Sequence, residues 1–358
     1  MLLINPREKF HRNKEFELIK ENKKNILKNK STGGRVEIDG IGRRILEYLP
    51  SNLNTIKKKL ETEHDMIISY TLLYFYLLVF WKGHLIEKTN KKIKFDSKKT
   101  GSDEKKTNIS IVIVTYNGEK FINENLNSIQ NQTFLPGEII IVDNASSDNT
   151  INILKKYATR VKLIRNKKNL HYAKGVNIGV QNATGDIIVI LNQDVVLDDH
   201  FLAEVEKKYQ SSANKHDLAA IVPQMRFMKL KGFINSMGNR ISNRGWGSDN
   251  YFGVVDIGQL KALKFEKSTC FGAIAVTHNG WKEVGKLDEK YGSYYEDVDW
   301  SFRAHLKAKK MIVAPDAIVY HHFGGSYDPG LRLKFVIKNR LRFILKNFSG
   351  RVMFGFLK

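Results

Sequence analysis

The stretch at 186–194 constrains the fold of this chain more than any other. Five consecutive apolar residues, most of them β-branched, lie between Asp186 and a polar end at 192–194. This pattern is typical of a short strand that is buried on both faces in a parallel sheet. Such strands deliver functional groups at their carboxyl ends, where ligands bind. Asp194 is therefore either a ligand of a divalent cation or a cap of the helix expected over 199–210. This stretch alone favours neither interpretation.

The segment before this strand alternates between strand and helix patterns. Strands are expected at 109–115, 138–142, 161–164 and 187–191, and helices at 119–130, 145–157 and 173–182. This alternation predicts a doubly wound α/β fold, with a mixed, mainly parallel sheet flanked by helices. Asn117 and Asp143 follow the first two strands, so we expect them at the same sheet edge as Asp194. Helix capping alone does not explain this convergence.

The pattern becomes less regular after residue 210. Further strands are expected at 218–222 and 311–321, and the Gly- and Asn-rich stretch at 232–256 is expected to be a substrate-facing insertion. The last strand ends in His321 and His322. Because successive side chains of a strand point to opposite faces, at most one of these histidines is a ligand of a given site.

Three carboxylates lie within four positions, at Glu296, Asp297 and Asp299, among aromatic residues. One interpretation is that they stabilise the positive N-terminus of a helix that begins near Asp297. The other is that aromatic neighbours desolvate a carboxylate and raise its pKa, which suits a general base. We expect Asp297 to be that base and Asp299 to support the helix start or Arg303.

The charge of the chain lies mainly in its flanks. The net charge is +22 over 358 residues, and residues 331–358 contain eight basic residues and no acidic one. No zinc-finger spacing, RNA-recognition motif or phosphate-binding loop occurs, so we expect no nucleic acid partner and favour an anionic membrane surface. The single cysteine, Cys270, excludes an internal disulfide and fits a reducing compartment. We expect a cytoplasmic protein, peripheral at the inner face of the cell membrane.

Three regions are predicted from these features. Residues 1–107 form a basic, mostly helical N-terminal extension, 108–330 form the catalytic domain, and 331–358 form a basic amphipathic helix. That helix either lies in the membrane interface or packs on the domain. The uncharged segment at 66–81 would span about 24 Å as a helix. It could lie in the membrane plane or re-enter it, be buried, or span it.

Seven groups of short motifs carry a family resemblance. They lie in order at 111–117, 141–150, 177–179 with 183–186, 191–194, 271–273, 295–303 and 321–326. Over 108–327 the chain resembles the family 2 inverting glycosyltransferases of the GT-A fold. It looks closest to the rhamnosyltransferase-like branch that builds bacterial surface polysaccharides.

The resemblance implies transfer of rhamnose or a similar hexose, with inversion, from a dTDP- or UDP-sugar to a saccharide or lipid-linked acceptor. It implies donor-binding roles for Thr115, Asn117, Asp143, Gly175, Asn177, Asn192 and Gln193, catalytic roles for Asp297 and Glu296, and a Mg²⁺ or Mn²⁺ site at Asp194 and His321. Asn192 departs from the family, whose Asp-x-Asp motif has an acid at this position. A single carboxylate with a histidine and phosphate oxygens still suits Mg²⁺.

Two other functions are compatible with parts of the sequence. A sugar nucleotidyltransferase would need a Gly-rich, basic loop after the first strand, and 116–119 is not such a loop. A catalytically inactive, membrane-associated subunit of a polysaccharide-assembly system would not need Glu296, Asp297 and His321.

Overall fold

The computed structural model describes residues 107–242, 245–256, 268–324 and 329–348, isolated positions between 260 and 266, and five short strands before residue 53. The chain divides into two compact units. The first contains 1–99, 226–235 and 251–260, and the second contains 100–225, 236–250 and 261–358. All of the predicted site residues belong to the second unit.

The first unit contains a three-stranded antiparallel sheet in the order β2-β3-β4 and a two-stranded pair, β1-β5. The bounds are Lys9–Phe10, Phe16–Glu21, Lys24–Asn29, Arg35–Ile38 and Ser51–Asn52 for β1 to β5. The predicted helical structure is therefore wrong for these residues. The β2-β3 register places Glu17 opposite Lys28 and Leu18 opposite Leu27. Opposite charges and apolar residues across a hairpin stabilise strands, and this pairing is not visible in a helical periodicity.

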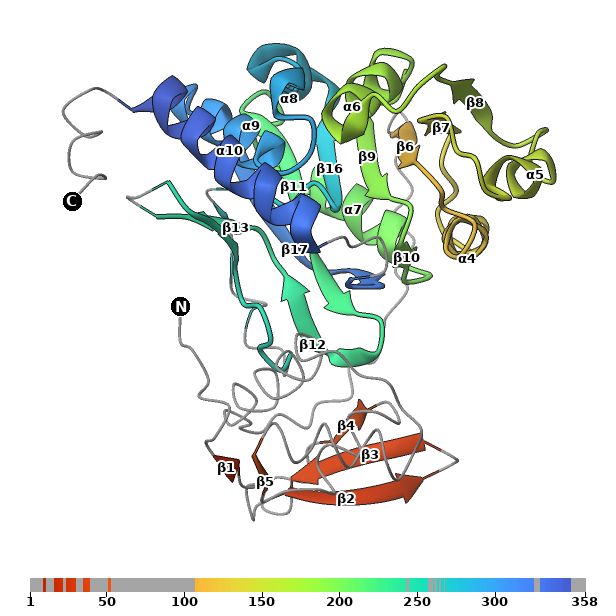
Figure 1. Ribbon diagram of the computed structural model, residues 1–358, viewed down its shortest axis with the longest axis vertical. Helices are drawn as coiled ribbons and strands as arrows, with labels where there is room; N and C mark the ends of the chain where they lie inside the picture. The colour runs from red at the N-terminus through yellow and green to blue at the C-terminus, as the bar shows by residue number, and fades with distance from the viewer. Residues whose placement is uncertain are drawn as a thin grey trace. The chain divides into compact units, whose positions relative to one another are not determined.

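The second unit is built on one mixed sheet with the strand order β10-β17-β11-β16-β9-β6-β7-β8 (Figure 1). β6, β7, β8 and β9 are parallel to their neighbours within this group, whereas β16 joins β9 in the antiparallel direction. The strands are β6 Ile109–Thr115, β7 Glu138–Asp143, β8 Lys162–Arg165, β9 Ile187–Asn192, β10 Val195–Leu197, β11 Leu218–Phe227, β16 Ala273–Thr277 and β17 Lys310–His321. The predicted alternation is confirmed, and the parallel part of the sheet is limited to β6 to β9.

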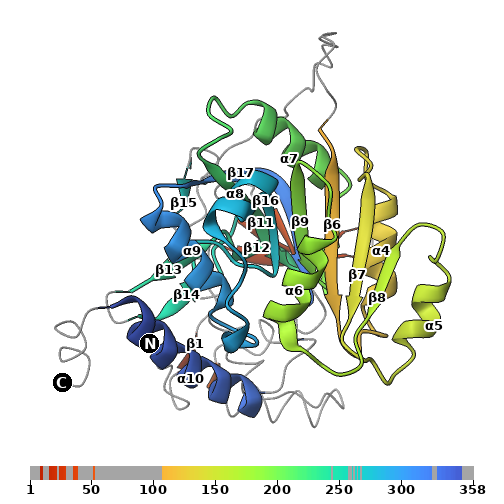
Figure 2. The same ribbon diagram turned by 90° about the horizontal axis from the view of Figure 1, so that it is seen from above.

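Helices cover both faces of this sheet (Figure 2). They are α4 Ile122–Gln130, α5 Thr150–Lys155, α6 His171–Gln181, α7 Phe201–Gln210, α8 His278–Val284, α9 Glu296–Leu306 and α10 Pro329–Asn347. A short hairpin, β13 Asn239–Ile241 with β14 Gly247–Asp249, and one turn of 3-10 helix, η1 Glu289–Tyr291, complete the site region.

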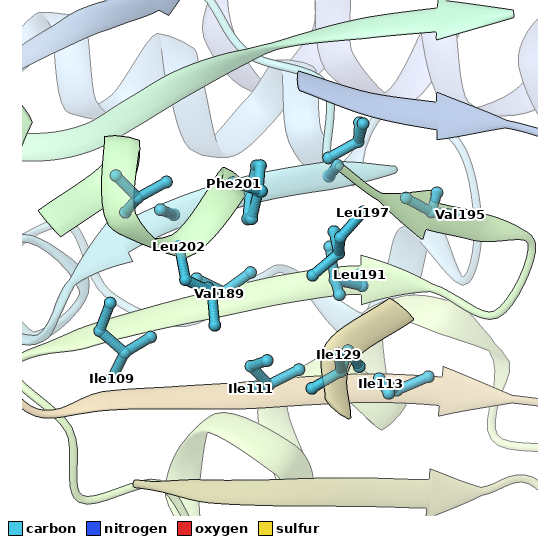
Figure 3. Close-up of a cluster of buried hydrophobic side chains, with 14 of the residues drawn as sticks. Ile109, Ile111, Ile113, Ile129, Val189, Leu191, Val195, Leu197, Phe201 and Leu202 are labelled. Atoms are coloured by element: carbon cyan, nitrogen blue, oxygen red, sulfur yellow. The ribbon is translucent and has the colours of Figure 1, made fainter. Parts of the chain in front are cut away.

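The apolar strands are buried on both faces of the sheet. Alternate side chains of each strand pack into two separate core layers, one on each face. Ile109, Ile111 and Ile113 of β6 pack in the layer shared with α4, α5 and α7 (Figure 3). The alternate residues Val112 and Val114 pack in the layer shared with α6, α8 and α9. This two-sided burial is the reason that β6 and β9 are continuous apolar runs rather than alternating ones. It fixes the carboxyl ends of these strands, from which the site is built.

The C-terminal helix α10 packs on the domain. Its Phe343 is fully buried among Tyr291, Tyr295 and Val298. Asn339 donates hydrogen bonds to the carbonyl oxygens of three residues that precede α9. The helix Pro329–Asn347 thus packs on the domain, although its exposed side is not only basic, since Leu333, Ile337, Leu341 and Leu345 are exposed; its contact with a membrane stays a prediction. None of the helices in the described residues is long and apolar enough to cross a membrane, and the predicted segment at 66–81 lies outside the described residues.

Candidate active site

The first part of the site is the junction between the ends of β6 and β9. Thr115 donates a hydrogen bond to Oε1 of Gln193 at 2.6 Å, and the Tyr116 N–H donates to the same oxygen at 3.0 Å. The Gln193 amide in turn donates to the Tyr116 carbonyl. Thr115 and Gln193 therefore tie two strand ends together. These hydrogen bonds hold the loop that contains Asn117 at the same sheet edge as Asp194.

The loop after β7 is fixed to the loop after β6. Asp143 is fully buried, and both of its carboxylate oxygens accept from the Ser146 N–H at 3.2 and 3.3 Å. Asn117 has a left-handed backbone with φ of 49°, and its side-chain oxygen accepts from the Ser147 N–H. Arg165 lies 3.9 Å from the Asp143 carboxylate. The predicted convergence of Asn117 and Asp143 at one edge is confirmed, while their contact with a donor stays a prediction.

Gly175 and Asn177 of α6 have packing roles in this structure. A Cβ on Gly175 would lie 2.7 Å from a methyl group of Val114, so the glycine allows α6 to approach the sheet closely. The Asn177 amide both accepts from the Leu287 N–H at 2.9 Å and donates to the Leu287 carbonyl at 3.0 Å. Because Leu287 already uses this amide, Asn177 holds the segment before η1. The geometry does not support a direct donor contact.

Asp194 and His321 form the second part of the site. His321 Nε2 lies 3.5 Å from Asp194 Oδ1. His322 points away and lies 2.8 Å from Glu124. The two rings thus have different partners, and the expectation that at most one of them is a ligand of this site stays a prediction. Among the residues that the structure describes, no group of three or more His, Cys, Asp or Glu side chains could hold a metal ion. A cation here would take one carboxylate and one imidazole from the chain, and its remaining ligands from elsewhere.

The third part is the first turn of α9, where Glu296 and Asp297 lie side by side. Burial raises the pKa of Asp297 to about 6, and the charge of Asp249 adds to the effect. Burial and the neighbouring Asp297 raise the pKa of Glu296 well above its usual range. Glu296 Oε2 is buried and accepts no hydrogen bond within the described part of the chain, whereas Asp297 accepts one from the Val298 N–H at 2.8 Å. Asp297 is therefore the member of the pair that ionises first.

The hairpin β13–β14 supplies two further groups to Asp297. Asn239 of β13 donates to Asp297 Oδ2 at 3.1 Å and is itself buried. Asp249 of β14 is its register partner across the hairpin. Asn239 stabilises the charged form of Asp297 and Asp249 disfavours it, so the hairpin adjusts a pKa that burial raises. The predicted insertion at 232–256 thus includes residues of the site region.

Tyr172 connects these parts. Its hydroxyl donates to the Phe271 carbonyl. Burial raises the pKa of Tyr172 first, and the charges of Glu296, Asp297 and Asp194 raise it further. The carboxyls of the second and third parts of the site thus act on one hydroxyl, although they are about 100 positions apart in the chain. The side-chain amide of Asn192 lies beside the segment that contains Phe271 and Gly272. Its nitrogen would be 3.6 Å from a Cβ on Gly272.

Sequence reasoning missed Tyr172, Asn239 and Asp249. Asn239 and Asp249 lie in the Gly- and Asn-rich stretch at 232–256, which was expected to face the substrate. The sequence indicated the stretch but did not indicate which of its residues contact Asp297. Tyr172 carries no signal of its own, since a tyrosine near a helix start is most often a packing residue.

A known protein family matches the part of the chain that contains the strands β6 to β9 and the loops at their carboxyl ends. Residues 110–257 match the family Glycosyl transferase family 2. This part of the chain is therefore similar to the glycosyl transferase family 2 domain. The match includes Thr115, Asn117, Asp143 and Asp194. The acid pair of α9 and His321 lie beyond the matched residues.

Several curated proteins are similar to this chain over short stretches. The putative glycosyltransferase EpsE of Bacillus subtilis is 39% identical over 84 residues, which are 22% of this chain and 30% of EpsE. The poly(ribitol-phosphate) beta-N-acetylglucosaminyltransferase TarS of Staphylococcus aureus is 29% identical over 140 residues, 36% of this chain and 22% of TarS. The chain therefore spans less than a third of the length of either relative.

Two solved structures show the same fold. GalNAc-T7 with UDP, GalNAc and Mn²⁺ is matched with a TM-score of 0.56 and 17% identity over 71% of this chain and 50% of that chain. The mannosyltransferase PcManGT from Pyrobaculum calidifontis, with GDP-Man and Mn²⁺, is matched with a TM-score of 0.51 and 15% identity. The match covers 88% of this chain and 79% of that chain. The mixed sheet with helices on both faces is thus the GT-A arrangement that the sequence predicted.

Proposed function

We propose that this protein is a glycosyltransferase that moves a sugar from a nucleotide-sugar donor to a saccharide or lipid-linked acceptor. The observation that carries the proposal is the position of Asp194 beside His321 at 3.5 Å, together with the charges of Asp194, Glu296 and Asp297, all of which raise the pKa of the buried Tyr172. A family 2 domain supplies the donor half, and α9 supplies a carboxyl with a pKa near 6. A buried carboxyl with a pKa raised to about 6 suits a general base.

The proposed chemistry is a single displacement at the anomeric carbon. Asp297 takes the proton of an acceptor hydroxyl while the hydroxyl oxygen forms a bond to that carbon. The bond from the carbon to the diphosphate oxygen breaks, and the nucleoside diphosphate leaves with both electrons of that bond. Attack on the face opposite to the leaving group inverts the configuration. Glu296 stays protonated longer than Asp297, so the pair carries a single negative charge when Asp297 acts as base.

Asp194 and His321 fit a divalent cation, Mg²⁺ or Mn²⁺. An oxygen and a nitrogen ligand 3.5 Å apart suit a cation that keeps water or phosphate oxygens as its other ligands. Bound there, the cation would neutralise charge on the leaving diphosphate. Both solved structures of this fold contain Mn²⁺ together with a nucleotide or a nucleotide sugar, which supports a metal for this chain.

Metal dependence is tested by turnover of the purified full chain with and without EDTA. We expect that excess EDTA abolishes sugar transfer and that added Mg²⁺ or Mn²⁺ restores it. Asp194→Asn is expected to lose most activity with an unchanged melting temperature. Full activity in excess EDTA would leave Asp194 as a structural residue and remove the metal from the proposal.

The donor is proposed to be a dTDP-, UDP- or GDP-sugar, with rhamnose or a similar hexose as the transferred group. Thermal-shift screening of these donors identifies it, because a ligand of the folded state raises the melting temperature by mass action. For Asp143→Ala we expect donor binding weaker by about 1–3 kcal/mol, the scale of a hydrogen bond to a charged group. Unchanged donor affinity in calorimetry would contradict the assignment of Asp143.

Sugar transfer to a saccharide acceptor also separates this proposal from its alternatives. A nucleotidyltransferase would release pyrophosphate from a nucleoside triphosphate, and an inactive assembly subunit would bind donor without consuming it. We place the reaction in polysaccharide synthesis on the cytoplasmic side of the cell membrane, without a nucleic acid partner.

A further inference from the structure

Helix α10 has one face that is fixed to the domain. Arg342 and Lys346 form ion pairs with Asp288 at 2.7 and 3.1 Å. Phe343 is buried, and the Asn339 amide is within 2.8 Å of carbonyl oxygens before α9. Figure 1 shows α10 running beside α9. These contacts determine which side of α10 faces outward.

The outward side of α10 is apolar. Four large residues at spacing four have exposed fractions above one half: Leu333 61%, Ile337 56%, Leu341 58% and Leu345 57%. Residues at this spacing lie in one stripe on a helix. Large apolar side chains on a surface are unremarkable singly, but a continuous stripe marks an interaction surface. We call these four residues the α10 stripe.

Basic residues border the α10 stripe. Lys334 and Lys338 are exposed beside it, and α10 contains no Asp or Glu. Along one edge, Arg340 stacks on the half-exposed ring of Trp246 at 4.0 Å. An apolar stripe bordered by cations and by a tryptophan is the composition that binds at the boundary between acyl chains and anionic headgroups.

We propose that the α10 stripe docks the protein on an anionic lipid bilayer. A second copy of the chain is the less suitable occupant, because two facing α10 helices would bring Lys334 and Lys338 of both copies together without an acidic partner on either helix. Docking goes beyond the proposed sugar transfer and does not depend on it, so its test measures no turnover.

Docking on this face would also be connected to the acid pair. Asn339 holds the carbonyls of Tyr291, Ser293 and Tyr294. Tyr294 and Tyr295 have φ of 68° and 74°, a conformation that neighbouring contacts must maintain. The helix that rests on the lipid is therefore the one that holds the segment leading into Glu296 and Asp297.

Co-sedimentation of the full-length protein with vesicles tests the proposal. The vesicles are phosphatidylcholine alone, or phosphatidylcholine with phosphatidylglycerol. We expect binding to the anionic vesicles, and we expect Ile337→Glu/Leu341→Glu to weaken it about tenfold or more. The matched control is Leu135→Glu/Leu306→Glu, which changes two leucines that are equally exposed but outside α10. The control should bind as the unmodified protein does.

Two further measurements complete the test. Lys334→Gln/Lys338→Gln should weaken binding to anionic vesicles and reduce its sensitivity to salt. Melting temperature and light scattering establish that each variant is folded and report its mass. Vesicle binding that survives Ile337→Glu/Leu341→Glu would overturn the proposal. So would a folded protein that binds no vesicles but changes from dimer to monomer in this variant, since the α10 stripe would then be a contact between two copies.

Discussion

The acid pair Glu296–Asp297 and the carboxylate Asp299 lie in the first turn of the same helix, yet their surroundings are opposite. Asp299 is fully buried and is bonded to Arg303 Nε at 2.9 Å, Lys346 Nζ at 3.0 Å and the Tyr291 hydroxyl at 3.2 Å. Within the described residues, no Lys or Arg forms an ion pair with Glu296 or Asp297. Asp297 instead accepts a hydrogen bond from Asn239 and lies near the charge of Asp249.

The difference shows how one helix turn can serve both stability and chemistry. The side chains at 297 and 299 leave the helix in different directions, so other elements decide what each one meets. α10 brings cations to Asp299, and the β13–β14 hairpin brings an amide and a carboxylate to Asp297. A carboxylate that is paired with cations holds helices together. One without a cation keeps a pKa that suits a base.

The comparison between Asp297 and Asp299 predicts its largest effect on turnover. Asp297→Asn should lower kcat by roughly 10²–10⁴, the usual contribution of a positioned base. Donor binding should be nearly unchanged, because the proposed nucleotide contacts lie at the ends of the strands and not on α9. Asp299→Asn should cost less activity than Asp297→Asn. Steady-state kinetics and donor calorimetry on both variants make the measurement.

The opposite ranking would reverse the two roles. If Asp297→Asn keeps near-normal turnover while Glu296→Gln or Asp299→Asn abolishes it, the base is another member of this turn.

Much of the second unit was predictable from sequence because its strands are buried on both faces. Continuous apolar runs such as Ile187–Asn192 have few alternatives, and the polar residues that follow them had to lie at one sheet edge. Asn117, Asp143 and Asp194 were found in this way. The separation of Asp297 from Asp299 was also expected, and Arg303 is the partner that was named.

What could not be predicted depends on contacts between distant segments. The pairing of Gln193 with Tyr116, of Asn177 with Leu287 and of Asn239 with Asp297 leaves no periodic trace in the chain. In sequence, an amide that binds a ligand looks the same as one that forms hydrogen bonds with the backbone. The strands at Phe16–Glu21 and Lys24–Asn29 were missed for a similar reason, since they are defined by their pairing with each other across the hairpin.

The second effect is on stability. Asp299→Asn removes the acceptor for Arg303 and Lys346, so we expect a loss of about 2 kcal/mol in the free energy of unfolding. This is below the full cost of an unpaired buried charge, because both cations are partly exposed. Urea denaturation measures it. The matched control is Asp199→Asn, an exposed carboxylate, which should change stability by less than about 0.5 kcal/mol. Equal losses in the two variants would mean that the network under α9 is not a stabilising one.

The smallest effect is on pH dependence, and it tests whether the hairpin sets the pKa of Asp297. If Asp297 must be ionised to act, kcat/KM should rise with pH through about 6 and then level off. Asn239→Ala removes a hydrogen bond that favours the charged form, so the pKa of Asp297 rises and the rising limb moves to higher pH. Asp249→Asn removes a like charge, so the limb moves to lower pH. Each shift should be about one pH unit or less. Structural damage alone would lower the plateau in both variants without moving the limb in opposite directions. If the rising part of the kcat/KM profile stays at the same pH in both variants, Asn239 and Asp249 do not affect the pKa of Asp297.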